Sequence, residues 1–373
     1  MCSSDLSKIM KVIMTGGGTG GHIYPAIAIA DRIMERNNNP EILFVGTEKG
    51  LEKELVPKSG YNMKFITVSG ISRKHLLRNF KVAREYIAAK RQAKKIIRDF
   101  QPDIIIGTGG YVCGPMVKAG AEMGVKTFIH EQNAFPGLTN KMLERCVDKV
   151  FLGFEAAGKI FKKPEKHIVS GNPVRDEFFK IRKNVAREKL GIDENDFVLL
   201  AFGGSQGAGR LNKAMMKIVA KYSNVEKITV LFATGKAYYR PILTEFEETG
   251  IHPGENIRIL EYIDHMEHYL SAADLVISRS GALAVSEISV CGVPSILIPS
   301  PNVTGNHQMF NARVLVEREG AILMEEKDLN GDRLYELIDD IKKDEKKLHQ
   351  MSLNTKECAP LDASDIIYYN ITS

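Results

Sequence analysis

Short runs of apolar residues alternate with stretches of helical periodicity along the whole chain. In the first half, runs rich in valine, isoleucine and leucine cover residues 9–14, 42–45, 64–68, 103–106, 126–130 and 148–152. In the second half they cover residues 197–202, 227–233, 257–260, 274–277, 294–298 and 321–323. The runs are continuous rather than alternating with polar residues, which is typical of parallel strands covered by helices on both faces.

This alternation predicts the fold class and the division into domains. It favours an α/β protein with right-handed crossovers and two doubly wound parallel sheets. A length of 373 residues also suits two domains. The turn cluster Ser170-Gly171-Asn172-Pro173 separates the two series. We therefore expect domains over residues 1–171 and 172–359, with a last helix in 360–373 that packs back on the first domain.

Three of the apolar runs lead into glycine-rich segments: Gly16 to Gly21, Gly107 to Gly110, and Gly203 to Gly207. A strand, a glycine turn and a helix N-terminus together make an anion site, because phosphate can approach the backbone and free N–H groups face it. Ligands of open α/β sheets bind beyond the carboxyl ends of the strands. We expect two facing domains around one cleft, each holding one phosphorylated substrate.

The charge of the chain is concentrated in one segment. The formal net charge of +5 is too small to indicate a nucleic-acid partner. Ten Lys/Arg and one acid, Glu85, lie between Ser72 and Arg98. Basic charge beside an apolar helical stripe suits anionic lipid head groups, so we expect docking on an anionic membrane surface. Alternatively, the stripe packs on the first sheet and the charges are only solvated; the stripe consists of Leu76, Phe80, Ala83 and Ile87, next to Leu77.

Other features exclude several classes. Five scattered cysteines show no metal-ligand spacing, and no Asp-x-Asp with apolar flanks offers a metal–diphosphate site, so we expect no metal and no cofactor. Diphosphate charge would then fall to backbone N–H groups and to cations such as Arg175. We expect no signal peptide, no membrane span of roughly 18 apolar residues, and disorder in residues 1–10.

Polar residues near the strand ends are candidates for catalysis or binding, each with a structural alternative. His22 can accept a proton from a hydroxyl nucleophile or cap its turn. The run His130 to Asn133 can orient a sugar or cap the next helix. Ser280 is expected as an N-cap, and Glu287 can bind a ribose diol or face solvent. Gln308 can bind sugar hydroxyls or be a surface amide.

The first glycine segment also matches the dinucleotide fingerprint Gly16-x-Gly18-x-x-Gly21, which raises an oxidoreductase as an alternative. That fingerprint requires an acid at the end of the second strand to bind a ribose. Here the strand ends at Thr47, and the nearest acid, Glu48, comes one or two residues too late. The nicotinamide interpretation is therefore disfavoured.

Seven motifs follow one another in order across nearly the whole chain: GGGTGGHIYPA, GTGGYVCGP, HEQNAFPGLTNK, GNPVR, GGSQGA, RSGALAVSEI and HQMFNA. In these motifs the chain resembles the MurG family of bacterial glycosyltransferases. The resemblance implies a two-domain GT-B fold and an inverting transfer of N-acetylglucosamine from UDP-N-acetylglucosamine. The acceptor would be the MurNAc 4-hydroxyl of undecaprenyl-diphosphate-MurNAc-pentapeptide, lipid I, giving lipid II for peptidoglycan. The enzyme would sit on the cytoplasmic face of the cell membrane.

The resemblance also implies roles for individual residues. His22 would be the general base, Glu287 would bind ribose and Gln308 the sugar hydroxyls. The main chain near Ile263 would hold uracil. Further donor contacts would be Ser205, Ala282, Leu283, Ala284, Val285 and Ser286, with alanine at 284 where some relatives have threonine. The cleft would also be lined by Thr19, Gly20, Gly21, Asn133 and Arg175.

Two other functions are compatible with some of these motifs. A processive glycolipid synthase acting on diacylglycerol is disfavoured by the acceptor-side segments GTGGYVCGP and HEQN. A catalytically inactive membrane scaffold is disfavoured because His22, Glu287 and Gln308 are all present.

Overall fold

The computed structural model describes residues 9–68, 76–204 and 207–373, without the side chains of 76–83 and 304. Disorder is expected for residues 1–10; residues 1–8 of that segment, and the candidate Ser205, lie outside the described residues. The chain forms two compact units. Unit 1 comprises Met1–Pro173 and Asp362–Ser373, and unit 2 comprises Val174–Leu361.

Unit 1 is built on a parallel sheet of seven strands in the order β3-β2-β1-β4-β5-β6-β7. Its strands are β1 (Lys11–Gly16), β2 (Glu41–Gly46), β3 (Asn62–Phe65), β4 (Ile104–Gly109), β5 (Lys126–Glu131), β6 (Lys149–Leu152) and β7 (His167–Val169). Its helices are α1 (Gly20–Arg36), α2 (Glu52–Lys58), α3 (Leu76–Phe100), α4 (Cys113–Glu122), α5 (Leu138–Leu143) and α15 (Ala363–Thr372).

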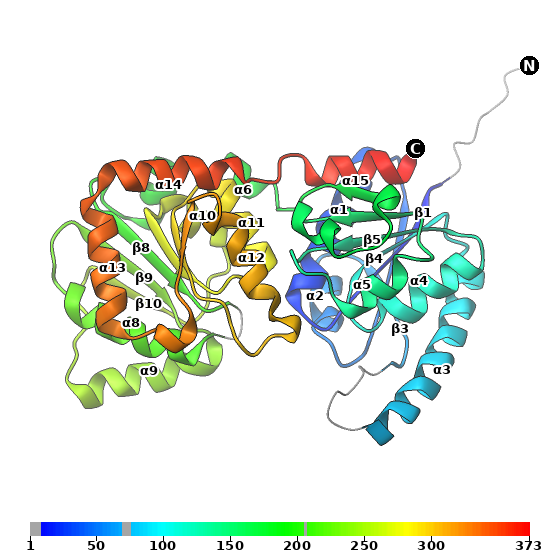
Figure 1. Cartoon of the computed structure of the whole chain (residues 1–373), viewed down its shortest axis with the longest axis horizontal. Helices are drawn as coiled ribbons and strands as arrows, with labels where there is room; N and C mark the ends of the chain where they lie inside the picture. The colour runs from blue at the N-terminus through cyan, green and yellow to red at the C-terminus, as the bar shows by residue number, and fades with distance from the viewer. Residues whose placement is uncertain (1–8, 69–75, 205–206) are drawn as a thin grey trace, which may run out of the picture. The chain divides into compact units, whose positions relative to one another are not determined.

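Apolar residues cover both faces of this sheet. Along β1, Ile13 belongs to the core shared with α3 and α4, whereas Val12 and Met14 belong to the core shared with α1 and α15. Successive strand side chains point to opposite faces, which explains why the strands read as continuous apolar runs. Helices accordingly lie on both faces of the sheet (Figure 1).

Unit 2 repeats this plan with six parallel strands in the order β10-β9-β8-β11-β12-β13. Its strands are β8 (Phe197–Phe202), β9 (Ile228–Ala233), β10 (Ile257–Leu260), β11 (Leu275–Ser278), β12 (Ser295–Leu297) and β13 (Ala321–Leu323). Its helices are α6 (Glu177–Lys180), α7 (Lys183–Leu190), α8 (Gly209–Tyr222), α9 (Lys236–Thr249), α10 (Met266–Ala272), α11 (Ala282–Cys291), α12 (His307–Val316), α13 (Gly331–Lys343) and α14 (Glu345–Glu357).

The predicted fold class is confirmed, since both sheets are parallel and doubly wound. Each of the twelve apolar runs overlaps a strand, although the run 64–68 shares only its first two residues with β3, and β7 is a strand that the pattern did not predict. In each sheet the strand order reverses once, between β1 and β4 in unit 1 and between β8 and β11 in unit 2. Segments that follow these strands lie where α/β proteins bind ligands.

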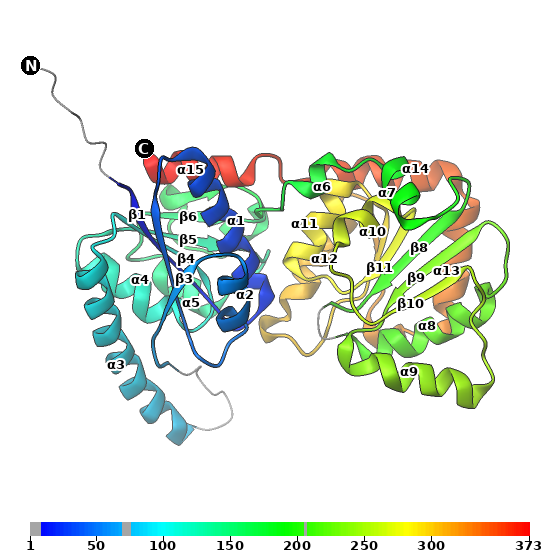
Figure 2. The ribbon, with the colours of Figure 1, turned by 180° about the vertical axis from the view of Figure 1, so that it is seen from behind.

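The last helix, α15, packs against α1 in unit 1 (Figure 2). Its Ile367 and Ile371 side chains are buried in the core that β1 and α1 share. Asp365 pairs with Arg36 at 3.0 Å on the outer side of this contact. Because the chain leaves unit 1 at Pro173 and returns at Asp362, unit 1 is completed only by the end of the sequence.

Candidate active site

The two glycine segments of unit 1 lie against each other at the carboxyl ends of β1 and β4. The Gly17 N–H donates to the Gly109 carbonyl oxygen at 3.2 Å. Gly110 has φ +88°, and a Cβ on it would stand 2.4 Å from the Gly17 oxygen, so only glycine permits this approach. One detail differs from expectation: the segment from Gly107 to Gly109 continues strand β4 and is not a turn.

His22 lies in the first turn of α1 directly beside this contact. Its Nδ1 is 3.0 Å from the Gly17 carbonyl oxygen, and 3.5 Å from the Thr19 hydroxyl. A carbonyl oxygen only accepts hydrogen bonds, so Nδ1 carries the proton and donates it. In neutral imidazole the lone pair then lies on Nε2. The half-buried His22 therefore presents Nε2 as a proton acceptor next to N–H groups of the helix start that have no partner within the helix.

A buried carboxylate that the sequence analysis missed organises the first glycine segment. Glu52, at the start of α2, is 0% exposed. Its Oε2 accepts from the Gly18 N–H at 2.9 Å, and its Oε1 accepts from the N–H and hydroxyl of Thr47 at 2.9 and 2.8 Å. In the sequence, Glu52 is recognisable only as an acid that begins a predicted helix shortly after Gly46 and Gly50. This pattern does not indicate which group its carboxylate binds.

The run His130 to Asn133 favours its structural alternative. His130 is fully buried, with Nε2 3.0 Å from the Gly171 oxygen and Nδ1 3.0 Å from Gln132 Nε2. Burial lowers the pKa of His130 to about 4, which keeps the ring neutral. Glu131 accepts from the Asn133 N–H at 2.9 Å and holds the chain ahead of α5. Only Asn133 of this run is appreciably exposed.

In unit 2, the segment after β11 is hydrogen-bonded to helix α12 where the donor contacts are expected. Helix α11 has Gly281 as its N-cap, so the prediction that Ser280 caps it was wrong. The Ser280 hydroxyl instead donates to the Gln308 carbonyl oxygen at 2.7 Å, and Asn311 Nδ2 donates to the Ser280 carbonyl at 3.1 Å. The Gln308 side chain accepts from the Ser300 N–H at 2.9 Å, which orients its amide.

Within the run from Ala282 to Glu287, only some side chains face outward. Ala282, Val285 and Ser286 are buried, and the Ser286 hydroxyl donates to the Ala282 carbonyl oxygen at 3.0 Å. Leu283, Ala284 and Glu287 are partly exposed. A ligand at this helix start would therefore meet backbone N–H groups and these three side chains.

Glu287 has a carboxyl group whose pKa is strongly perturbed. Burial raises its pKa to about 7, although Arg175 nearby acts in the opposite direction. Arg175 is itself paired with the buried Glu267 at 3.1 Å. A carboxylate that is costly to ionise gains from hydroxyl donors that a ligand brings. Ile263, just beyond β10, has a buried side chain, so it can offer a ligand only its main chain.

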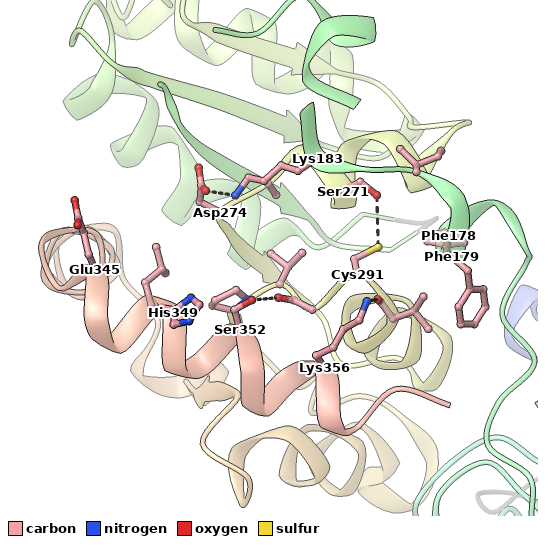
Figure 3. A pocket seen from close by; sticks show the side chains of 17 residues that line it. Phe178, Phe179, Lys183, Ser271, Asp274, Cys291, Glu345, His349, Ser352 and Lys356 are labelled. Carbon is pink, nitrogen blue, oxygen red and sulfur yellow. Dashed lines mark hydrogen bonds and ion pairs between the residues drawn. The ribbon is translucent and has the colours of Figure 1, made fainter. Parts of the chain in front are cut away.

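Unit 2 also contains a cavity of about 360 Å³ away from these residues. It lies beside Asp274 and Pro294, which precede β11 and β12, and hence at the opposite edge of the sheet. Figure 3 shows Ser352 and Lys356 reaching from α14 to the end of α11, where they donate to the Gly292 and Val290 carbonyl oxygens at 2.6 and 2.5 Å. These polar groups already have partners within the fold, and none of the predicted site residues lines this cavity.

The described part of the chain contains no cluster of three or more His, Cys, Asp or Glu arranged to hold a metal ion. It also contains no helix with the length and apolar character needed to span a bilayer.

Comparison with known proteins assigns the chain that carries these strand-end sites to a family. Residues 12–152 match the glycosyltransferase family 28 N-terminal domain, and residues 198–366 match the glycosyltransferase family 28 C-terminal domain. The chain belongs to glycosyltransferase family 28. The family 28 boundaries enclose both glycine segments of unit 1 and all the donor-side candidates of unit 2.

Relatives of this family 28 chain match it over almost its whole length. It is 45% identical over 360 residues to the UDP-N-acetylglucosamine--N-acetylmuramyl-(pentapeptide) pyrophosphoryl-undecaprenol N-acetylglucosamine transferase of Acetivibrio thermocellus, covering 96% of both chains. It is also 45% identical to the protein of the same name from Desulforamulus reducens, over 96% of this chain and 97% of the other.

A solved structure supports the fold. The crystal structure of Acinetobacter baumannii MurG superposes with a TM-score of 0.77 at 24% identity, covering 97% of this chain and 99% of that chain. The resemblance to the MurG family and the two-domain GT-B fold are thus confirmed.

Proposed function

We propose that this chain transfers N-acetylglucosamine from UDP-N-acetylglucosamine to the MurNAc residue of undecaprenyl-diphosphate-MurNAc-pentapeptide. The product is lipid II, the disaccharide precursor of peptidoglycan. The observation that carries the proposal is 45% identity over 96% of both chains to a relative named for this transfer. The glycine segments at the strand ends supply the anion sites that two diphosphate-linked substrates need.

The donor binds to unit 2 in this proposal. Glu287 accepts hydrogen bonds from the ribose diol, Gln308 binds hydroxyls of N-acetylglucosamine, and the main chain near Ile263 holds uracil. Backbone N–H groups at the start of α11, with Ser205, receive the diphosphate. Because Asn311 and Ser280 tie α12 to the end of β11, Gln308 is held in register with that helix start.

The acceptor side and the proton transfer are assigned to unit 1. Thr19, Gly20 and Gly21 form the exposed start of α1, whose N–H groups suit the acceptor diphosphate. His22 accepts the proton of the MurNAc 4-hydroxyl as that oxygen attacks the anomeric carbon from the side opposite to UDP. Single displacement inverts the α-linked donor to a β-linked product. Asn133 and Arg175 are assigned to substrate binding.

The direct test is an assay with UDP-N-acetylglucosamine and a lipid-linked MurNAc-pentapeptide analogue, followed by detection of the β-linked disaccharide. Diacylglycerol and a nicotinamide cofactor are tested in parallel to represent the competing activities. We expect His22→Ala to lower turnover by about 10²–10⁴ while the affinity for UDP-N-acetylglucosamine is nearly unchanged. Transfer to diacylglycerol alone, or no sugar transfer at all, would overturn the proposed function.

We also propose that α3 docks on an anionic membrane surface. In its second half Ala89, Ala93 and Ile97 are buried in a core that α3 shares with the rest of unit 1, while Ile87 from the predicted stripe is 53% exposed. The other members of the stripe lie outside the described side chains. The helix extends away from the rest of unit 1 at its first turns (Figures 1 and 2). Ile87 supports the docking interpretation over packing of the stripe on the sheet.

Vesicle co-sedimentation with and without anionic lipid tests this docking. Each Lys or Arg near an anionic surface contributes about 1 kcal/mol, so a triple charge reversal should abolish binding. The test variant combines Lys74→Glu, Arg78→Glu and Lys81→Glu. The matched control reverses the charge of three exposed lysines of unit 2 by the same substitution to glutamate, at Lys213, Lys346 and Lys347. Binding that ignores lipid charge and both variants would refute docking by α3 and leave the transferase proposal intact.

A further inference from the structure

Glu52 and His22 contact opposite ends of the same peptide group. The Gly18 N–H donates to Glu52 Oε2 at 2.9 Å, and the Gly17 carbonyl oxygen accepts from His22 Nδ1 at 3.0 Å. These two backbone atoms belong to the single peptide unit that joins Gly17 to Gly18. A buried carboxylate, a peptide group and an imidazole therefore form one continuous line of hydrogen bonds.

We propose that Glu52 is a positioning residue for the transfer, which orients His22 through the Gly17–Gly18 peptide and holds its ring in the tautomer with a basic Nε2. This inference rests on the proposed function, in which His22 is the general base. It extends that function by identifying the group that prepares the base. Glu52 itself is fully buried, so its role is to act through the peptide and not on a substrate directly.

The physical effect follows from how hydrogen bonds polarise one another. A peptide N–H that donates to a carboxylate makes its own carbonyl a stronger acceptor. The carbonyl then holds the proton on Nδ1 and stabilises the imidazolium that forms when Nε2 takes a proton. A carboxylate bonded to the histidine directly has the same two effects in serine hydrolases. Here the peptide group stands between the carboxylate and the ring.

Neighbouring glycines, which have no side chains, leave space for the Glu52 carboxyl group. A Cβ on Gly17 would lie 2.5 Å from Glu52 Oε1, and a Cβ on Gly50 would lie 1.9 Å from Oε2. A Cβ on Gly46 would lie 2.6 Å from the Glu52 side chain. Three glycines thus leave room for one carboxyl group. All three of its donors suit the ionised form, which only accepts hydrogen bonds.

Thr47 provides a matched control for a merely structural role. It donates two hydrogen bonds to Oε1, the oxygen that does not face Gly18. Thr47→Val removes the hydroxyl donor to the carboxylate but leaves the carboxylate and its bond to Gly18. Glu52→Gln keeps the size of the side chain and removes its charge. A structural role predicts similar losses in both variants, and a positioning role predicts a loss only in Glu52→Gln.

The experiment combines kinetics with the tautomer of His22, measured by 15N NMR of the ring nitrogens in the full-length chain. For Glu52→Gln we expect turnover to fall about 10- to 100-fold, the acid limb of the kcat/KM profile to move to lower pH, and the Nδ1-protonated population to drop. Thr47→Val should retain the wild-type tautomer and profile. UDP-N-acetylglucosamine affinity and thermal unfolding report whether each variant is folded.

Two results would overturn the inference: a wild-type tautomer with turnover within about twofold in Glu52→Gln, or equal losses in both variants. If Glu52→Gln does not fold, Glu52→Asp carries the same comparison, because it keeps the charge but withdraws it from the Gly18 N–H. Near-normal turnover in His22→Ala would instead contradict the proposed base. The tautomer measurement still decides the role of Glu52 in that case, so the two failures are distinguishable.

Discussion

The carboxyl group of Glu287 gives donor binding a predictable dependence on pH. Burial raises its pKa to about 7, and only the ionised form offers both of its oxygens as acceptors to a ribose diol, because protonation turns one of them into a donor. At one pH unit below the pKa roughly a tenth of the groups are ionised. We therefore expect the affinity for UDP-N-acetylglucosamine, whose phosphates do not titrate there, to rise about tenfold between pH 6 and pH 8. Isothermal titration calorimetry over this range measures it.

Substitutions distinguish the contribution of Glu287 to this pH dependence from that of other acidic groups. Glu287→Gln should flatten the dependence, and Glu287→Ala should weaken binding by about 2–3 kcal/mol, or 30- to 150-fold. Glu248→Gln, at an exposed acid of the same unit, is the control and should change neither. A wild-type affinity that is constant across this range, or unchanged binding in Glu287→Ala, would argue that Glu287 does not contact ribose.

The hydrogen-bond partners of single residues were harder to predict from the sequence than the helices and strands. Ser280 has the right type and place for an N-cap, but its hydroxyl is drawn to the Gln308 carbonyl from a segment 28 residues away. Glu52 makes its decisive contact with Gly18, 34 residues earlier in the chain. Spacing within a motif cannot reveal such partners, because they meet only once neighbouring strands are paired.

At the scale of elements, the contact between the two glycine segments should be sensitive to one methyl group. Gly110 and Gly124 both have positive φ, +88° and +76°, so alanine at either costs about 1 kcal/mol of backbone strain. A Cβ on Gly124 meets nothing within 4 Å, whereas one on Gly110 meets the Gly17 backbone. Gly110→Ala should therefore displace the partner of His22 and lower turnover by about 100-fold.

Gly124→Ala is the control for this prediction, with the same strain and open space around it. It should show the stability loss in thermal unfolding and keep wild-type turnover. Equal turnover in the two variants would mean that the contact between the glycine segments does not position the site.

Elements themselves were largely predictable. Apolar runs such as Val198 to Phe202 are long and fully buried, so periodicity alone marks them as strands. Strand β7 was missed because it has only three residues, begins with His167 and leaves Val169 53% exposed. The glycines of the second segment predict a turn, because glycine usually ends a strand, yet pairing with β5 extends β4 to Gly107 and beyond.

At the scale of the whole molecule, unit 1 depends on the last helix of the chain. Lys149 donates to the Asn370 side chain at 3.1 Å, and Asp365 pairs with Arg36. Beneath these polar contacts, Ile367 is fully buried in a core formed entirely by residues of unit 1. The stability of unit 1 is therefore set by a segment that follows all of unit 2 in the sequence.

Ile367→Ala tests this dependence. Removing a fully buried isoleucine side chain typically costs about 2–5 kcal/mol, and here the cost should fall on unit 1 because every core neighbour belongs to it. Chemical denaturation should show an earlier transition for unit 1, while the affinity for UDP-N-acetylglucosamine, assigned to unit 2, stays at the wild-type value. Tyr369→Ala, on the same helix but 57% exposed, is the control and should be nearly neutral. A matching loss of UDP-N-acetylglucosamine affinity in Ile367→Ala would contradict this partition, because it would mean that α15 stabilises both units.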